Sequence, residues 1–256
     1  MTARAARIDQ ILAYPDDDLL RLSHAVDLDA DNDPQGAFIK LQVERWNQER
    51  SSKHHRDRPS GAETKLISAH GAAWAGELAG LVRGYSFHRG FVAMIQLSPA
   101  QFARNADRIF ALAPIQHADI DNGDPASVDA ALASPHLAKL RSVSFAKNGI
   151  DDALCGRIAT CTHLRNARWV RLTDNQIGPD GVDALAASSI FDNKVIVDLM
   201  NNPCNPVERP MRDWDGSVQG VEMPAEGHAI VARHGKKSWL TFPWFSMSKV
   251  PDRYHA

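Results

Sequence analysis

The apolar positions between residues 140 and 204 recur with a fixed spacing. The first copy reads Leu140-x-x-Val143-x-Phe145-x-x-Asn148-x-Ile150. The later copies read Ala167-x-x-Val170-x-Leu172-x-x-Asn175-x-Ile177 and Lys194-x-x-Val197-x-Leu199-x-x-Asn202-x-Cys204, so the asparagines are 27 residues apart. Side chains two positions apart in a strand point to the same side. The pattern therefore predicts three short strands in which Val143, Phe145 and their counterparts face one core.

The segments between these strands have the features of helices. Asp151 places negative charge where a helix would begin, which suits the helix dipole, and Leu154 and Ile158 follow on one helical face. Pro179 opens a second such segment, which carries Leu185. Each repeat is thus predicted to run strand, turn, helix, turn.

A repeat of this length, with leucine-like positions and an asparagine at fixed offsets, is typical of a leucine-rich repeat. One such unit cannot bury its apolar face alone, so several must stack to form a continuous core. The sequence therefore predicts an α/β fold, a right-handed leucine-rich repeat solenoid. In this short horseshoe, parallel strands would line the concave side and helices the convex side.

The asparagine position has a physical reason of its own. Where the chain turns away from a strand, buried backbone groups need partners. An amide side chain carries both donors and an acceptor, so stacked asparagines are predicted to bridge one repeat to the next. A weaker fourth unit, Ile115-x-x-Ala118-x-Ile120-x-x-Gly123, precedes the others with glycine in the asparagine slot, as terminal units are often atypical.

The flanking segments predict further elements. Three helices are expected near the N-terminus: one at residues 7–14, one that carries Leu19, Leu22 and Val26, and one that begins after Asp33-Pro34. A fourth helix is expected at 66–81, then a strand at 89–95 and a fifth helix that begins at Ser98. Prolines end the repeats after Asn202, a turn is expected at 213–216, and a helix at 224–235. Three parts follow: residues 1–60 as a helical module with a basic linker, 61–206 as the solenoid with its N-terminal cap, and 207–256 as a C-terminal capping segment.

The chain resembles a known family over most of its length. The stretches that carry the resemblance are residues 11–18 (Ile-Leu-Ala-Tyr-Pro-Asp-Asp-Asp), Arg21-Leu22 and residues 33–42 (Asp-Pro-Gln-Gly-Ala-Phe-Ile-Lys-Leu-Gln). They are similar to the bacterial repeat-companion domain, a small module found ahead of leucine-rich repeats in planctomycetes and myxobacteria. Residues 23–28 depart from the Tyr-Ala-Asp-Trp-Leu block usual there. The resemblance implies the architecture, and it implies no catalytic residues.

Composition narrows the function classes. The net charge of −2 argues against general nucleic-acid binding, which depends on phosphate neutralisation. No apolar run approaches the length of a membrane span, and the N-terminus has no apolar signal core. We therefore expect a cytoplasmic protein that engages neither nucleic acid nor membrane. Three cysteines do not make a disulfide framework, so they are predicted to be free structural thiols.

Three places hold metal-ligating residue types without a complete ligand set. The acidic run at 27–33 lacks the glycine and terminal glutamate of a calcium loop. Cys161 and His163 have no second pair at short spacing, and His54 and His55 lie in a polar linker. We expect no metal and no cofactor.

Side chains that point away from the core along the strands form three predicted ladders. They are His117, Ser142, Trp169 and Ile196; Asp119, Ser144, Arg171 and Asp198; and Asp121, Ala146, Thr173 and Met200. Aromatic and arginine side chains often anchor interfaces. One interpretation is a surface that binds a protein or peptide, with Trp169 as apolar anchor and Arg171 steering an acidic partner. The other is that the C-terminal segment, including the aromatic run at 239–245, folds over these positions.

A non-catalytic binding module is the function we expect, and two alternatives stay open. His117, Asp119 and Asp121 alternate on one strand, where a histidine oriented by a carboxylate could serve as base or metal ligand. Against an enzyme, the chain carries no nucleophile motif, phosphate loop or ligand quartet. The second alternative is a protein that presents a peptide to a separate modifying enzyme, and so binds without activity of its own.

Overall fold

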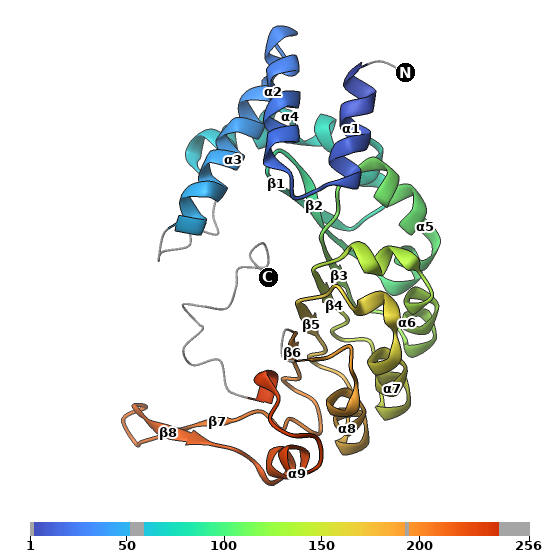
Figure 1. The fold of residues 1–256 in the computed structure, drawn as a ribbon, viewed down its shortest axis with the longest axis vertical. Coiled ribbons are helices and arrows are strands. Elements are labelled where there is room, and N and C mark those ends of the chain that lie inside the picture. Colours follow the sequence, from blue (N-terminus) through green and yellow to red (C-terminus); the bar gives the residue numbers. More distant parts are fainter. Residues whose placement is uncertain (1–2, 52–58, 193–194, 241–256) are drawn as a thin grey trace. The chain divides into compact units, whose positions relative to one another are not determined.

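The computed structural model describes residues 3–51, 59–192 and 195–240, which form a mixed α/β fold (Figure 1). Within these residues, nine α-helices accompany an open, mostly parallel sheet of six strands in the order β1-β2-β3-β4-β5-β6. The chain divides into two compact units. The N-terminal unit comprises residues up to Gln96 together with Asn105–His117, and the repeat unit comprises Leu97–Arg104 and the chain from Ala118. No helix in these ranges is long and apolar enough to cross a membrane.

The elements from the N-terminus to the first repeat are mostly helical. They are α1 (Ala3–Ala13), α2 (Asp18–Ala30), α3 (Pro34–Ser51), α4 (Gly61–Ala75), a 3-10 turn η1 (Gly76–Gly80), β1 (Gly84–His88), β2 (Phe91–Leu97) and α5 (Pro99–Leu112). The predicted helices and the predicted strand at 89–95 are confirmed. Strand β1 was not predicted; it pairs antiparallel with β2. Arg89 and Gly90 make the turn between them, and both have a positive φ.

Helix α2 buries a face of mixed polar and apolar residues and exposes two of its large apolar side chains. Leu19 is 77% exposed and Val26 is 61% exposed, whereas Arg21 and His24 are buried together with Ala25 and Leu28. Asp17 caps this helix, since its side chain accepts hydrogen bonds from the backbone of Leu19 and Leu20. The spacing of the large apolar residues along α2 therefore does not mark the face that is buried. The buried face is the one on which Arg21 finds its hydrogen-bond partners.

Aromatic and aliphatic side chains form the core of the N-terminal unit. Phe38 of α3 stacks on Trp74 of α4 at 4.8 Å between ring centroids, and it meets Phe87 of β1 edge-on at 5.5 Å. Ile39 and Val43, on the next positions of α3, pack in a separate buried cluster with Ala25 and Leu28 of α2. These contacts fix α3 between the other helices and the hairpin β1–β2.

The repeat unit follows the predicted order of strands and helices. Its elements are β3 (His117–Ile120), α6 (Pro125–Leu132), η2 (Pro135–Lys139), β4 (Ser142–Ser144), α7 (Asp152–Thr160), η3 (Thr162–Leu164), β5 (Trp169–Arg171), α8 (Pro179–Ala187) and β6 (Ile196–Asp198). Strands β4, β5 and β6 are parallel, and Val143, Val170 and Val197 lie opposite one another in the buried layer. Helices α6, α7 and α8 stand in a row along one side of these strands (Figure 1).

The asparagines bridge neighbouring repeats, as predicted. The Asn175 amide nitrogen donates to the carbonyl oxygen of Phe145 at 3.0 Å, and its oxygen accepts from the backbone N–H groups of Asn148 and Ile150 at 3.0 and 3.1 Å. Asn148 makes the matching contacts with Ile120 and Gly123, and Asn202 with Leu172 and Ile177. Each repeat therefore presents one side chain that satisfies the backbone of the repeat before it. We call this set the asparagine column.

The segment after the repeats contains β7 (Arg209–Arg212), β8 (Val218–Glu222), α9 (Ala225–His234) and η4 (Ser238–Leu240). The predicted helix and the predicted turn at 213–216 are confirmed, and the turn joins a hairpin that the sequence did not predict. Trp239 and Leu240 are buried. The rest of the aromatic run, residues 241–245, lies outside the described residues, so the proposed covering role of the C-terminal segment stays a prediction.

All three cysteines are free, as expected. Cys155 and Cys204 are buried, and Cys161 is half-buried. The Cys155 thiol donates to the carbonyl oxygen of Gly181 at 3.4 Å, and burial raises the pKa of this thiol to about 12. A thiol of that kind is a packing residue, because the reactive form is the thiolate.

Candidate binding surface

The register of the repeat strands aligns the predicted ladders on β4, β5 and β6. Ser142 pairs with Trp169, which pairs with Ile196. Ser144 pairs with Arg171, which pairs with Asp198. The alignment predicted from the spacing is thus confirmed for these strands. The alignment follows from the equal length of the repeats, because a shift of one residue in the strand pairing would turn every ladder side chain toward the core.

The ladder residues differ strongly in exposure. His117, Ser142, Ser144 and Thr173 are buried, and Asp119 is half-buried. Ile196 and Met200, in contrast, are 38% and 58% exposed, and Trp169, Arg171 and Asp198 are half-buried. The most exposed residues of the predicted site lie on β6 and just after it, and half-buried residues lie on β5 and β6 as well as at Asp119 and Asp121. We call Trp169, Arg171, Ile196, Asp198 and Met200 the β5–β6 face.

Polar contacts hold the charged residues of this face in place. The Nε of Arg171 donates to the hydroxyl oxygen of Thr173 at 3.2 Å, and Asp198 accepts from the backbone N–H of Met200 at 3.1 Å. Burial raises the pKa of Asp198, and the charge of Asp174 raises it further, while the Met200 hydrogen bond and the Arg171 charge act in the opposite direction. Within the described ranges, no ion pair joins Arg171 to Asp198.

Trp169 lies with its polar atom inward. The indole nitrogen is shielded from solvent and has no acceptor among the described residues, although the side chain as a whole is half-buried. A donor left without an acceptor costs free energy. The polar atom of Trp169 is therefore not on the exposed part of this side chain.

Residues 3–51, 59–192 and 195–240 contain no group of three or more His, Cys, Asp or Glu side chains arranged to hold a metal ion. In the acidic run at 27–33, the side chains of Asp27, Asp29, Asp31 and Asp33 instead form ion pairs with Arg7, Lys40 and Arg4. His54 and His55 lie outside the described residues.

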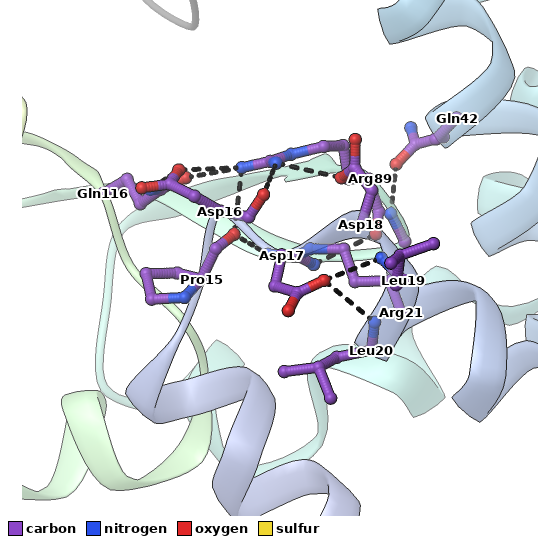
Figure 2. A network of polar contacts seen from close by, with 11 residues as sticks. Pro15, Asp16, Asp17, Asp18, Leu19, Leu20, Arg21, Gln42, Arg89 and Gln116 are labelled. Carbon is purple, nitrogen blue, oxygen red and sulfur yellow. Dashed lines mark hydrogen bonds and ion pairs between the residues drawn. The ribbon is translucent and has the colours of Figure 1, made fainter.

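A second concentration of polar groups lies in the N-terminal unit, around Arg89 (Figure 2). Its guanidinium donates to a carboxylate oxygen of Asp18 at 3.0 Å, to the carbonyl oxygen of Pro15 at 3.0 Å and to the side-chain oxygen of Gln116 at 3.1 Å. Gln116 in turn donates to Asp16 at 2.9 Å. Arg89 is buried, and its guanidinium lies 5.4 Å from the ring centre of Trp46.

Arg21 extends this network from α2. It donates to the carbonyl oxygens of Arg89 at 3.1 Å and Pro15 at 2.7 Å, and it lies over the ring of Phe91. Burial lowers the pKa of Arg21 to about 9, and the nearby positive charge of Arg89 acts in the same direction. Gln42 of α3 completes the network by accepting from the backbone N–H of Gly90 at 2.8 Å.

The network around Arg21 and Arg89 was not identified as a site from the sequence. Part of it lies in the stretches that resemble the companion domain, and Arg89 begins the predicted strand at 89–95, but no spacing rule connects Arg21 with Arg89, 68 residues later. The partners of both guanidinium groups come from within the protein, which suits a structural role. We therefore treat the network as the element that holds the hairpin turn against α2 and α3, and the β5–β6 face as the candidate binding surface.

Comparisons of the chain with protein-family models, with curated proteins and with solved structures return no match. The repeat pattern, the β5–β6 face and the network around Arg89 are the features from which a function can be argued.

Proposed function

We propose that the chain is a leucine-rich repeat protein with a right-handed solenoid, and that it acts as a non-catalytic binding module for a protein or peptide. Support for the repeat class comes from the 27-residue period, the parallel pairing of β4, β5 and β6, and the asparagine column. The proposal includes the N-terminal companion module at residues 1–60, the solenoid at 61–206 and the capping segment at 207–256. It also includes a cytoplasmic location.

The observation that carries the binding role is the exposure of two large apolar side chains, one on β6 and one just after it. Ile196 lies opposite the half-buried Trp169 in register, and Met200 follows two residues after β6. Large apolar side chains that gather on one surface are typical of interaction sites. Tryptophan and arginine are also both enriched among the residues that carry most of the binding energy at interfaces.

The inner strand of this face, β5, is held by backbone pairing on both sides, which supports a binding role. Backbone pairing on both sides fixes Trp169 and Arg171, since β5 lies between β4 and β6. The asparagine column fixes the turns that follow the strands. A surface that is ordered before binding loses less conformational entropy when a partner arrives.

The test is binding of purified protein to an array of short synthetic peptides of varied sequence. Trp169→Ala should remove most of the signal, because it deletes the largest apolar contact of the face. The matched control is Trp214→Ala in the β7–β8 turn, where the side chain is 93% exposed; this variant should keep the full signal. Circular dichroism should show both variants folded.

Met200→Glu gives a second test in case Trp169→Ala loses its fold, because Met200 is well exposed and its replacement leaves the core intact. It should also reduce the signal. Unchanged binding in both face variants would overturn the proposal, and so would a wild-type protein that binds no peptide.

A further inference from the structure

The sequence holds two Asn-Gly pairs, Asn122–Gly123 and Asn148–Gly149. Spontaneous deamidation of asparagine is fastest in such a pair, because glycine has no side chain to shield the backbone nitrogen that attacks the asparagine side chain. Both pairs lie in the repeat unit. The structure nevertheless gives the two asparagines opposite surroundings.

Asn148 is buried, and both ends of its amide are engaged. The amide nitrogen donates to the carbonyl oxygen of Ile120 at 2.9 Å, and the amide oxygen accepts from the backbone N–H of Gly123 at 2.7 Å. These contacts would have to break before the side chain could turn toward Gly149, and burial keeps away the water that completes the reaction. Asn148 is therefore protected against deamidation.

Asn122 lies in an exposed turn between β3 and α6. Its φ of +57° is in the left-handed region, which asparagine tolerates better than most residues. The nitrogen that would attack its side chain is that of Gly123, and the N–H of this residue is donated to Asn148. The exposed asparagine is thus restrained by a hydrogen bond to the buried one.

We propose that Asn122 is a site of spontaneous deamidation, and that the side chain of Asn148 slows the reaction by holding the nitrogen of Gly123. The Gly123 nitrogen gives up its proton to solvent and bonds to Cγ of Asn122. The bond from Cγ to Nδ2 breaks, and ammonia leaves with a proton taken from solvent. Water then opens the five-membered imide at either carbonyl carbon, which gives aspartate or isoaspartate.

The two products differ in their effect on the repeat unit. Aspartate adds a negative charge at an exposed position and leaves the path of the main chain unchanged. Isoaspartate lengthens the main chain before Gly123 by one atom, which moves the Gly123 nitrogen away from Asn148. The first contact of the asparagine column would then be lost. This inference does not depend on the proposed binding function.

The experiment incubates the full chain at mildly alkaline pH, where the Gly123 nitrogen loses its proton more readily. Mass spectrometry of proteolytic peptides follows the conversion of Asn122 and Asn148, and chromatography separates the aspartate and isoaspartate forms. In the folded protein, we expect Asn122 to react faster than Asn148. In protein unfolded by urea, the two should react at similar rates, and Asn122 should react faster than it does in the folded protein.

Asn148→Ala tests the restraint directly. Removing a hydrogen bond of ordinary net strength should raise the rate at Asn122 by roughly 2- to 10-fold. Asn202→Ala is the matched control, because it makes the same substitution at the far end of the asparagine column, where the side chain contacts Leu172 and Ile177. It should leave the rate at Asn122 unchanged, and circular dichroism should show both variants folded.

Several results would overturn the inference. Faster reaction at Asn148 than at Asn122 in the folded protein would remove the site, and so would an unfolded protein in which Asn122 does not react. Equal rates at Asn122 in Asn148→Ala and Asn202→Ala would remove the restraint. Equal rates at Asn122 in folded and unfolded wild-type protein would do the same, and this comparison holds even if Asn148→Ala does not fold.

Discussion

The two units of this protein bury polar groups in different ways. The N-terminal unit buries the guanidinium groups of Arg21 and Arg89, and it surrounds them with main-chain carbonyl oxygens and the side chains of Asp16, Asp18 and Gln116. The repeat unit uses neutral amides, which pair with the backbone of the adjacent repeat. A buried charged group needs hydrogen-bond partners from several segments of the chain, whereas a buried amide needs only the backbone of the neighbouring repeat.

The difference has an energetic consequence. A buried ion pair adds little net stability compared with apolar packing, but removing one partner leaves an uncompensated charge and costs about 3–5 kcal/mol. Removing a buried amide leaves unpaired neutral groups, at about 1–3 kcal/mol for each group. The N-terminal unit should therefore be the more sensitive of the two to single substitutions and to pH.

The largest effect is expected from Arg89→Ala. This change removes the donor shared by Asp18, Pro15 and Gln116, so the free energy of unfolding should fall by about 3–5 kcal/mol. Urea unfolding followed by circular dichroism measures it, and amide hydrogen exchange should quicken in β1, β2 and α2.

The control for that prediction is Arg104→Ala, since Arg104 is exposed on α5. Its cost should stay within about 0.5 kcal/mol. A loss below about 1 kcal/mol for Arg89→Ala would remove the distinction between the two units.

An intermediate effect is expected from Asn175→Ala. The substitution leaves the buried backbone N–H groups of Asn148 and Ile150 and the carbonyl of Phe145 without their partner. At the lower end of the cost for each of these three groups, we expect a loss of about 3 kcal/mol. Asn202→Ala is the matched comparison. Asn202 is less buried and accepts from only one backbone group, Ile177, so its loss should be about 1–2 kcal/mol.

Amide hydrogen exchange distinguishes a local loss of these hydrogen bonds from a destabilisation of the whole protein. In Asn175→Ala, the amides of Asn148 and Ile150 should exchange faster, while those of α2 and α3 keep their rates. Equal losses for Asn175→Ala and Asn202→Ala would show that the column acts through something other than the number of backbone groups it satisfies.

The smallest effect is expected on the stability of the protein at acidic pH. Burial lowers the pKa of His24, and the charge of Arg4 acts in the same direction; burial and Arg89 hold the pKa of His88 well below its usual range. The unfolded chain would bind protons at these histidines first, near pH ~6.5. Stability is therefore fully present above that pH and is lost as pH falls toward the folded-state values.

The measurement is urea unfolding between about pH 7.5 and pH 5, where each histidine can contribute a slope of up to ~1.4 kcal/mol per pH unit. His24→Gln should flatten the curve, because glutamine does not titrate. A curve of unchanged steepness in this variant would exclude His24 as a source of the acid sensitivity.

The sequence predicted the repeat unit well because its contacts are periodic. Asn175 reaches groups that lie 25 to 30 residues earlier, and Asn148 and Asn202 repeat the geometry with their own neighbours. The strand register follows from the same equal spacing. The exposure of the ladders did not follow from it, since Ser142 and Ser144 are buried while Ile196 and Met200 are open.

The sequence by itself determined the repeat period, the amide bridges and the alignment of β4, β5 and β6, because each depends on residues a fixed distance apart. The tertiary structure alone decided that α2 turns Arg21 and His24 inward and leaves Leu19 and Val26 in solvent. A charged side chain is buried only where distant segments supply its partners. Arg21 donates to the nearby carbonyl of Pro15 and also to the carbonyl of Arg89, and no local pattern could indicate the second partner.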